Sequence, residues 1–225
     1  MIRHLRNRRR RLPLSFKMDW APVKRGIRVL IVAVLISTAL SMNGVVPASA
    51  ASNGRDPEIA AALDRIARGT YTAEDLQLIR SRPGIASQVP DPTRPVEIGA
   101  RGGVLIQPMA VGAAGCWWAD VWFQRFSLLG FSLYKWHHYV AWCGNGSVVT
   151  GWQNRYDYVT DVNSVIYVRE LVVNQASGPG SWQAWSHMQR HLEYCVVRYG
   201  CYANAYPWSK IYVYGDGRYT YEGSY

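Results

Sequence analysis

The sequence predicts an all-β fold, an antiparallel β-sandwich or partly closed barrel of about seven strands preceded by a short helical pair. Residues 116–225 contain 26 aromatic residues, of which nine are Trp, fourteen Tyr and three Phe. Segments rich in aromatic and β-branched residues alternate with the turn sequences GNG, SGPG and GDG, a pattern typical of hairpins. We expect strands at 116–127, 131–143, 147–156, 164–174, 182–197, 208–214 and 218–222.

Residues 1–50 have the pattern of a secretory signal. They hold ten Lys/Arg and one acid, and the basic stretch is followed by the apolar run Val29–Leu40. Small residues at Ala48 and Ala50 predict cleavage between Ala50 and Ala51. We therefore expect a secreted, extracellular protein that meets the membrane only through this segment during export.

Two alternatives for the leader stay open. The apolar run is shorter than the roughly 20 residues that span a bilayer, but an uncleaved anchor extending to Val46 is conceivable. The basic region is unusually long, and Met18 offers a more ordinary start than Met1. A twin-arginine reading of RRRRLPL matches that pattern poorly.

The formal charge of +10 is concentrated in this leader. Residues 51–225 hold fifteen Lys/Arg and fourteen Asp/Glu, which leaves a charge of only +1. A nearly neutral mature chain without a phosphate-binding glycine loop argues against a nucleic-acid partner.

Residues 51–90 are predicted to be helical. Asp56 can cap a first helix with Pro57 in its first turn, and Thr72 can cap a second helix with Asp75 three residues on. This pair has little to bury by itself, so we interpret it as a lid on the main domain or as a propeptide. Residues 91–112 are interpreted as a linker, and residues 113–225 as the disulfide-stapled β domain.

Four cysteines in an exported chain predict two disulfides and leave no free thiol for catalysis or zinc. A Cys116–Cys143 bond across neighbouring strands makes paired positions sum to 259 and centres the turn at Leu129-Gly130, where the only glycine of the segment lies. Cys195 and Cys201 enclose a short turn, which favours sequential pairing. Long-range pairings between the two cysteine pairs remain possible from the sequence.

The next turn contains Asn145-Gly146, the strongest short hairpin signal, and predicts paired positions that sum to 291. Because side chains alternate across a strand, the two hairpins place an aromatic-polar set on one sheet face. We expect this face to bind ligand through Trp118, Asp120, Trp122, His137, Tyr139, Trp152 and Asn154, with Gln124 nearby. The alternative is that a second sheet or the helices cover it and its aromatic residues are core.

A C-terminal hairpin is predicted around Asp216-Gly217. It would pair Tyr214 with Tyr219 and Tyr212 with Tyr221 on one face.

The stretches CWW…WCGNGSVVT, GSW.AW…YC, AYPW and VYGDGRYTY give the chain a resemblance to a family of exported, two-disulfide, Trp/Tyr-rich β proteins from high-GC Gram-positive bacteria. The resemblance covers roughly residues 113–225. It implies secretion and a β fold, and it implies no catalytic residues.

No residue pattern predicts a catalytic, metal or cofactor site. His137 and His138 are adjacent in a strand and so point to opposite faces. His187 and His191 share a face, which Glu193 continues on a strand, but a metal site would need a third ligand and an open position. The chain lacks G-x-S-x-G, and spacing pairs no two of the seven acids in residues 116–225.

These observations predict a secreted, non-enzymatic binding protein whose ligand is an envelope glycan or another protein. Two alternatives are a secreted hydrolase with an unrecognised His/carboxylate site and a toxin or inhibitor held inactive by a helical propeptide. The sequence does not indicate the oligomeric state.

Overall fold

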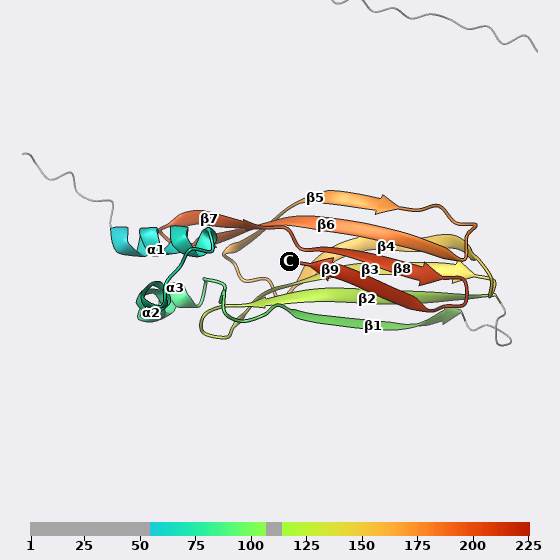
Figure 1. Cartoon of the computed structure of the whole chain (residues 1–225), viewed down its shortest axis with the longest axis horizontal. Coiled ribbons are helices and arrows are strands. Elements are labelled where there is room, and N and C mark those ends of the chain that lie inside the picture. Colours follow the sequence, from blue (N-terminus) through green and yellow to red (C-terminus); the bar gives the residue numbers. More distant parts are fainter. Residues whose placement is uncertain (1–54, 107–113) are drawn as a thin grey trace, which may run out of the picture. The chain divides into compact units, whose positions relative to one another are not determined.

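The computed structural model describes residues 55–106 and 114–225, where nine strands form two antiparallel sheets (Figure 1). The first sheet has the order β1 (Glu97–Ile106), β2 (Gly115–Phe126), β3 (Ser132–Gly144) and β4 (Val149–Thr160). The second has the order β5 (Ile166–Ala176), β6 (Gln183–Val196), β8 (Trp208–Tyr214) and β9 (Tyr219–Ser224), with β7 (Gly200–Ala205) also paired to β6. The predicted β-sandwich is confirmed. The predicted signal segment and its cleavage site lie outside the described residues.

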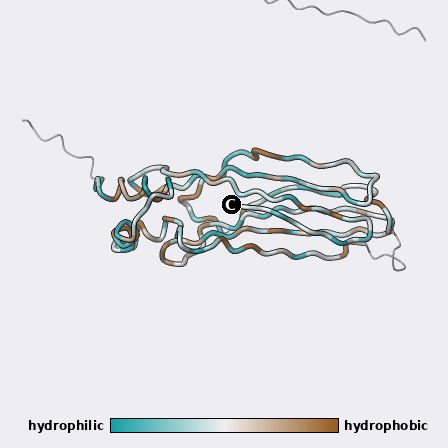
Figure 2. The backbone as a smooth tube through the Cα atoms, viewed as in Figure 1, coloured by the Kyte–Doolittle hydropathy of each residue, from teal (hydrophilic) through white to brown (hydrophobic). Residues whose placement is uncertain are grey.

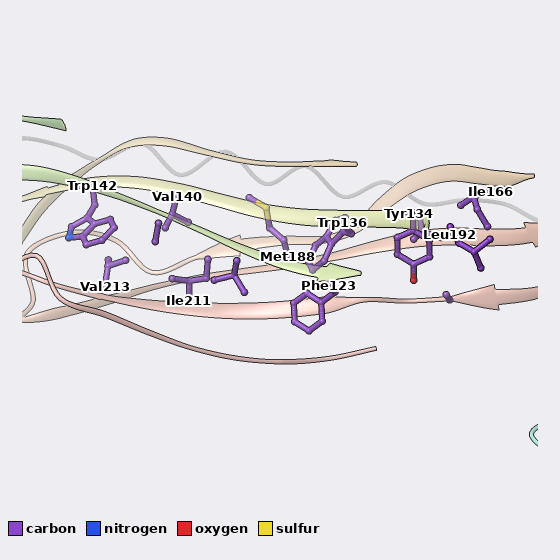
Figure 3. Close-up of a cluster of buried hydrophobic side chains, with 14 of the residues drawn as sticks. Phe123, Tyr134, Trp136, Val140, Trp142, Ile166, Met188, Leu192, Ile211 and Val213 are labelled. Carbon is purple, nitrogen blue, oxygen red and sulfur yellow. The ribbon is translucent and has the colours of Figure 1, made fainter. Parts of the chain in front are cut away.

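The core lies between the two sheets. The inward side chains of β2 and β3 include Phe123, Trp136 and Trp142, all fully buried, and they face Met188 of β6 and Ile211 of β8 (Figure 3). Full burial of such a side chain stabilises the fold by about 1.5–3 kcal/mol. Hydropathy changes repeatedly along the strands (Figure 2), as expected when every second side chain faces the core.

The helical segment packs on one end of this sandwich (Figure 1). Helix α1 (Pro57–Ala67) begins where the Asp56 side chain accepts a hydrogen bond from the backbone N–H of Glu58, and α2 (Ala73–Arg80) begins with the predicted Thr72–Asp75 capping box. A short third helix, α3 (Pro83–Ala86), follows. Apolar side chains of the helices form a second core with Leu128 and Val196 of the β region, so the helices cover an end of the sandwich and neither outward sheet face.

The β2–β3 hairpin has the predicted register. Paired positions sum to 259 from Gly115↔Gly144 to Arg125↔Tyr134, and Cys116 bonds Cys143. Cys195 also bonds Cys201, as sequential pairing predicts. Two disulfides are typical of proteins that work in an oxidising compartment.

The stretch interpreted as a linker contains a strand. Strand β1 pairs along its length with β2, from Glu97↔Gln124 to Gly103↔Trp118. Its sequence EIGARGGVLI has no alternation of apolar and polar residues, because three of its positions are glycines over which neighbouring side chains lie. Strand β7 was likewise not predicted.

The predicted β3–β4 register is wrong by up to four residues. Gly144 pairs with Val149, and irregularities in the ladder then bring Tyr139 opposite Tyr156 instead of Trp152. The loop after Gly144 holds four residues, closed by a 3.1 Å hydrogen bond from Asn145 N to Val148 O. The longer loop and the bulges together produce the shift.

The predicted C-terminal register is wrong by one residue. Val213 pairs with Tyr219 and Ile211 with Tyr221, because the turn contains three residues, Gly215 to Gly217, rather than two. A one-residue slip exchanges the faces of a strand. Tyr219 accordingly packs on the core against Trp142.

Among the helices of the described residues, none combines the length and the apolar character needed to cross a membrane.

Candidate binding face

The outward side of the first sheet carries the candidate site, and we call it the Asp120 face. Its side chains form four rows that run across β1, β2, β3 and β4. The rows are Glu97–Gln124–Lys135–Thr160, Gly99–Trp122–His137–Tyr158, Arg101–Asp120–Tyr139–Tyr156 and Gly103–Trp118–Ala141–Asn154. The second sheet packs on the opposite side, so this face is an outer surface of the sandwich.

Asp120 lies at the centre of the Asp120 face and is fully buried by its neighbours. Its carboxylate accepts hydrogen bonds from Arg101 Nη2 at 3.0 Å, from His137 Nδ1 at 3.1 Å and from the Tyr158 hydroxyl at 2.9 Å. The donors come from β1, β3 and β4, so one carboxylate ties together all four strands of the sheet. A buried carboxylate is tolerated when it is paired and hydrogen-bonded in this way.

These contacts change the pKa values of Asp120 and Tyr158. Burial by itself would raise the pKa of Asp120, but the hydrogen bonds from His137 and Tyr158 and the charge of the neighbouring residues outweigh it and lower the pKa below its usual value. Burial and the hydrogen bond to Asp120 raise the pKa of Tyr158 to about 12. The carboxylate is therefore ionised and the phenol neutral at neutral pH.

The hydrogen-bonded chain continues from His137 to the edge of the sheet. Because ionised Asp120 only accepts, Nδ1 of His137 carries a proton, and Nε2 lies 3.1 Å from Oγ1 of exposed Thr160. The imidazole ring stacks on Tyr158, with ring centroids 4.3 Å apart and planes 11° apart. The order carboxylate, imidazole, hydroxyl is that of a hydrolase triad.

Aromatic rings extend across the strands in a nearly parallel series. Trp118 and Tyr139 have centroids 6.0 Å and planes 18° apart, and Tyr139 and Tyr156 have centroids 4.8 Å and planes 28° apart. Tyr156 is 42% exposed, the highest value among these rings. Four cavities in the described part of the chain are lined by side chains outside this aromatic series.

Glycines on β1 make room for the two tryptophans. A Cβ atom at Gly99 would overlap the ring of Trp122, and one at Gly103 would collide with the ring of Trp118. Both indoles therefore lie over the backbone of β1.

Two cations border the rings. Lys135 Nζ lies 4.5 Å from the centroid of the Trp122 ring, and the Arg101 guanidinium lies about 6 Å from both Trp118 and Trp122. The Arg101 side chain is 61% exposed although it contacts Asp120. Two cations therefore border the aromatic series, and one of them, Arg101, is paired with the buried carboxylate of Asp120.

The structure brings together most of the predicted site residues. Trp118, Asp120, Trp122, His137 and Tyr139 share the Asp120 face, and Gln124 and Asn154 lie at its ends. Trp152 does not belong to it. The bulge in β4 sets Trp152 opposite Trp142, where it packs on the core and donates to the Ser177 carbonyl at 2.9 Å.

Sequence reasoning missed the residues that complete the site. Arg101 and the two glycines lie on β1, which had been interpreted as a linker. Tyr156, Tyr158 and Thr160 take their places only because the β3–β4 register differs from the one predicted. The alternation of aromatic residues in NRYDYVT was the one available signal for these three.

The other histidines occupy different surroundings. His138 points into the core, as opposite faces require, between Ser209 Oγ at 2.6 Å and Ser186 Oγ at 2.8 Å. His187 and His191 lie outward on β6, where His187 packs against Trp208 and His191 contacts Glu170 and Asn204. In the described ranges, the one three-residue group with metal-ligand spacing is Glu193 with Cys195 and Cys201, whose sulfurs are bonded to each other.

Comparison with protein-family models, curated proteins and solved structures found no match to this chain.

Proposed function

We propose that the chain is an exported binding protein that recognises a cell-envelope glycan on its Asp120 face. The observation that carries the proposal is the nearly parallel series Trp118, Tyr139 and Tyr156 on an outward sheet face. Flat aromatic rings suit the C–H faces of sugar rings, and an outward sheet face suits an extended polymer better than a small molecule.

The borders of the aromatic series support a negatively charged glycan. Arg101 is exposed beside the rings, and Lys135 forms no ion pair within the described part of the chain. Both can reach carboxylate or phosphate groups on a ligand that lies across the rings. Trp, Tyr and Arg are also the residues that dominate protein–protein interfaces, so a protein ligand is the competing class.

The test is binding of the purified protein to isolated cell-wall material and to a glycan array. We expect Tyr156→Ala combined with Trp118→Ala to reduce binding at least tenfold. The matched control is Trp185→Ala, on the outward face of the other sheet. Binding that is unaffected by the double variant, or capture of a protein through the same residues without any glycan, contradicts the proposal.

A second candidate function, hydrolysis, rests on the Asp120–His137–Thr160 chain of hydrogen bonds. In this hypothesis Thr160 Oγ1 attacks an acyl or phosphoryl centre and His137 accepts its proton. His137 then passes the proton to the leaving group as its bond breaks, and water hydrolyses the resulting threonine ester. The same carboxylate also binds Arg101 and Tyr158, which is more typical of a structural network.

A fluorophosphonate probe separates the two candidates. Covalent labelling of Thr160 that is lost in Thr160→Val and in His137→Gln would establish the hydrolase. We expect the probe to leave the parent protein unlabelled, and we expect Thr160→Val to bind glycan as well as the parent does.

A further inference from the structure

Strand β1 forms an edge of the first sheet (Figure 1). It pairs with β2 on one side, and within the described part of the chain no backbone group outside β2 bonds to its residues Glu97–Ile106. The other side of β1 therefore presents a row of N–H and C=O groups without a protein partner. Such a row is a template for pairing with another strand.

The remaining edge strands carry features that discourage such pairing, because they are short or irregular. Strands β7 and β9 have six residues each, and the ladder of β5 with β6 is interrupted twice. Strand β4 is also bulged, and its Arg155 reaches across to β5, where it donates to the Gln175 carbonyl at 2.8 Å. Strand β1 pairs without interruption from Glu97 to Val104, and its ten residues include no proline.

The inward side chains of β1 are only partly covered by the second sheet. Ile98 lies opposite Phe123 and Val104 lies opposite Trp117, both of which belong to the core. Even so, Ile98 is 50% exposed and Val104 is 44% exposed. A strand added beside β1 would bury part of this apolar surface, in particular around Ile98.

The charges of β1 indicate which strand fits beside it. Glu97 and Arg101 lie on the outward side of the strand, two positions before and two positions after Gly99. If a second copy of β1 pairs with the first in antiparallel fashion about a two-fold axis at Gly99, Glu97 of each copy lies opposite Arg101 of the other. Ile98 then lies opposite Ala100. An axis at Arg101 would instead bring the two guanidinium groups together.

Both charged groups are available for this contact. Arg101 donates from Nε and Nη2 to Asp120, its Nη1 forms no hydrogen bond with the described residues, and its side chain is 61% exposed. The Glu97 side chain is 55% exposed and pairs with exposed Arg94. Such an exposed pair contributes little and is readily exchanged for another.

We propose that β1 is the interface of a homodimer, in which two copies of the strand pair in antiparallel fashion about a two-fold axis at Gly99. The two four-stranded sheets then join into one continuous sheet, and the axis perpendicular to it places both Asp120 faces on the same side. The pairing does not depend on whether the Asp120 face binds a glycan. A single pair of strands makes a small interface, so the dimer should form reversibly as the concentration rises.

The experiment combines sedimentation equilibrium of the purified protein with hydrogen exchange, over a concentration series that reaches the millimolar range. We expect the average mass to rise from that of the monomer towards that of the dimer. Over the same series, the backbone amides of residues 97–101 should exchange more slowly. The amides of the edge strands β4, β5 and β9 should exchange at an unchanged rate.

Two variants of β1 test how the copies meet. Glu97→Lys sets a lysine opposite Arg101 at two symmetric places, so dimerisation should be weaker by at least about tenfold. Ile98→Lys places an inward-pointing charge on the edge, a change that blocks strand pairing, and should leave a monomer. The matched control is Val172→Lys on edge strand β5, where the valine is 46% exposed, and it should dimerise like the parent.

Several outcomes overturn the proposal. These are a monomer at every concentration, an association that Glu97→Lys leaves unchanged, and concentration-dependent protection of another edge strand in place of β1. Glu97→Lys changes an exposed side chain, so it remains informative if Ile98→Lys does not fold.

Discussion

The outward faces of the two sheets both carry Trp, Tyr and charged side chains, yet they use them differently. On the Asp120 face, a fully buried carboxylate holds donors from three other strands. The outward face of the second sheet, which we call the His191 face, differs because its charged side chains form ion pairs that are partly exposed to solvent. This face consists of Trp185, His187, Gln189, His191, Glu193, Trp208, Lys210 and Tyr212.

The side-chain contacts of the His191 face each join two residues and are partly exposed to solvent. Arg169 binds Glu193 at 2.6 Å with its side chain 44% exposed, and the Tyr212 hydroxyl donates to Glu222 at 2.6 Å. Exposed ion pairs contribute about 0–1 kcal/mol, whereas removing one partner of a buried pair costs about 3–5 kcal/mol. Similar composition therefore produces separate, partly exposed contacts on one sheet and a single network around a buried carboxylate on the other.

The largest difference is expected for removal of one carboxylate from each face. Asp120→Ala leaves Arg101, His137 and Tyr158 without their acceptor and should lower the free energy of unfolding by about 3–5 kcal/mol. Glu193→Ala should lower it by less than about 1 kcal/mol. Denaturant unfolding of both variants measures the two values, and equal losses would remove the distinction between the faces.

The next largest loss of stability is expected where a glycine of β1 leaves room for a tryptophan ring. Gly99→Ala forces the Trp122 ring away from β1 and should cost about 2–3 kcal/mol, in the range for overpacking. Gly151→Ala on β4 is the matched control, because nothing lies within 4 Å of its added Cβ. Thermal melts compare the two. A Gly99→Ala protein as stable as Gly151→Ala would show that the indole has room to move.

Replacing a tyrosine by phenylalanine on each face tests the same contrast, because this change removes the hydroxyl and keeps the aromatic ring. Tyr158→Phe removes a hydrogen bond to buried Asp120 and should cost about 1.5 kcal/mol, whereas Tyr212→Phe should cost less than about 0.5 kcal/mol. The denaturant midpoints of the two variants, each compared with the parent, measure these two losses of stability. A larger loss in Tyr212→Phe would reverse the ranking of the two faces.

Protonation should produce the most gradual effect, which is small only when it is counted per pH unit. Burial between the sheets, aided by the charge of Arg155, lowers the pKa of His138 to about 3, whereas the unfolded chain protonates this residue near pH 6.5. The unfolded state therefore binds the extra proton between these values, and stability falls as the pH drops from about 6.5 towards 3, by about 1 kcal/mol per unit. Unfolding free energies measured across this range should show a smaller slope in His138→Gln.

His191 provides the control with the opposite sign. Its hydrogen bonds to Asn204 and Glu170 raise its pKa, so its stabilising contribution is present at low pH and is lost as the pH rises through the folded value. His191→Gln should therefore lose stability more steeply than the parent on acidification. A slope unchanged in both variants would assign the pH dependence to other groups.

Much of the Asp120 face follows from local signals. Cysteine spacing and a single glycine set the β2–β3 register, and strand alternation then put Asp120, Trp122, His137 and Tyr139 where they are found. The same reasoning failed for Trp152, because a bulge is a property of the paired strands and has no signature in one strand alone.

The sequence by itself determined the β class, most strand positions, the helix caps and the disulfide-closed hairpin, because these depend on alternation, turn chemistry and short-range pairing. Only the tertiary structure decided that β1 joins the sheet and that Asp120 receives donors from three strands. It also decided that Tyr156 lies beside Tyr139 in place of Trp152, and that Tyr158 lies beside His137 in place of Asn154. The physical reason is that these features depend on register and close approach between strands, which are fixed by packing across the whole sheet.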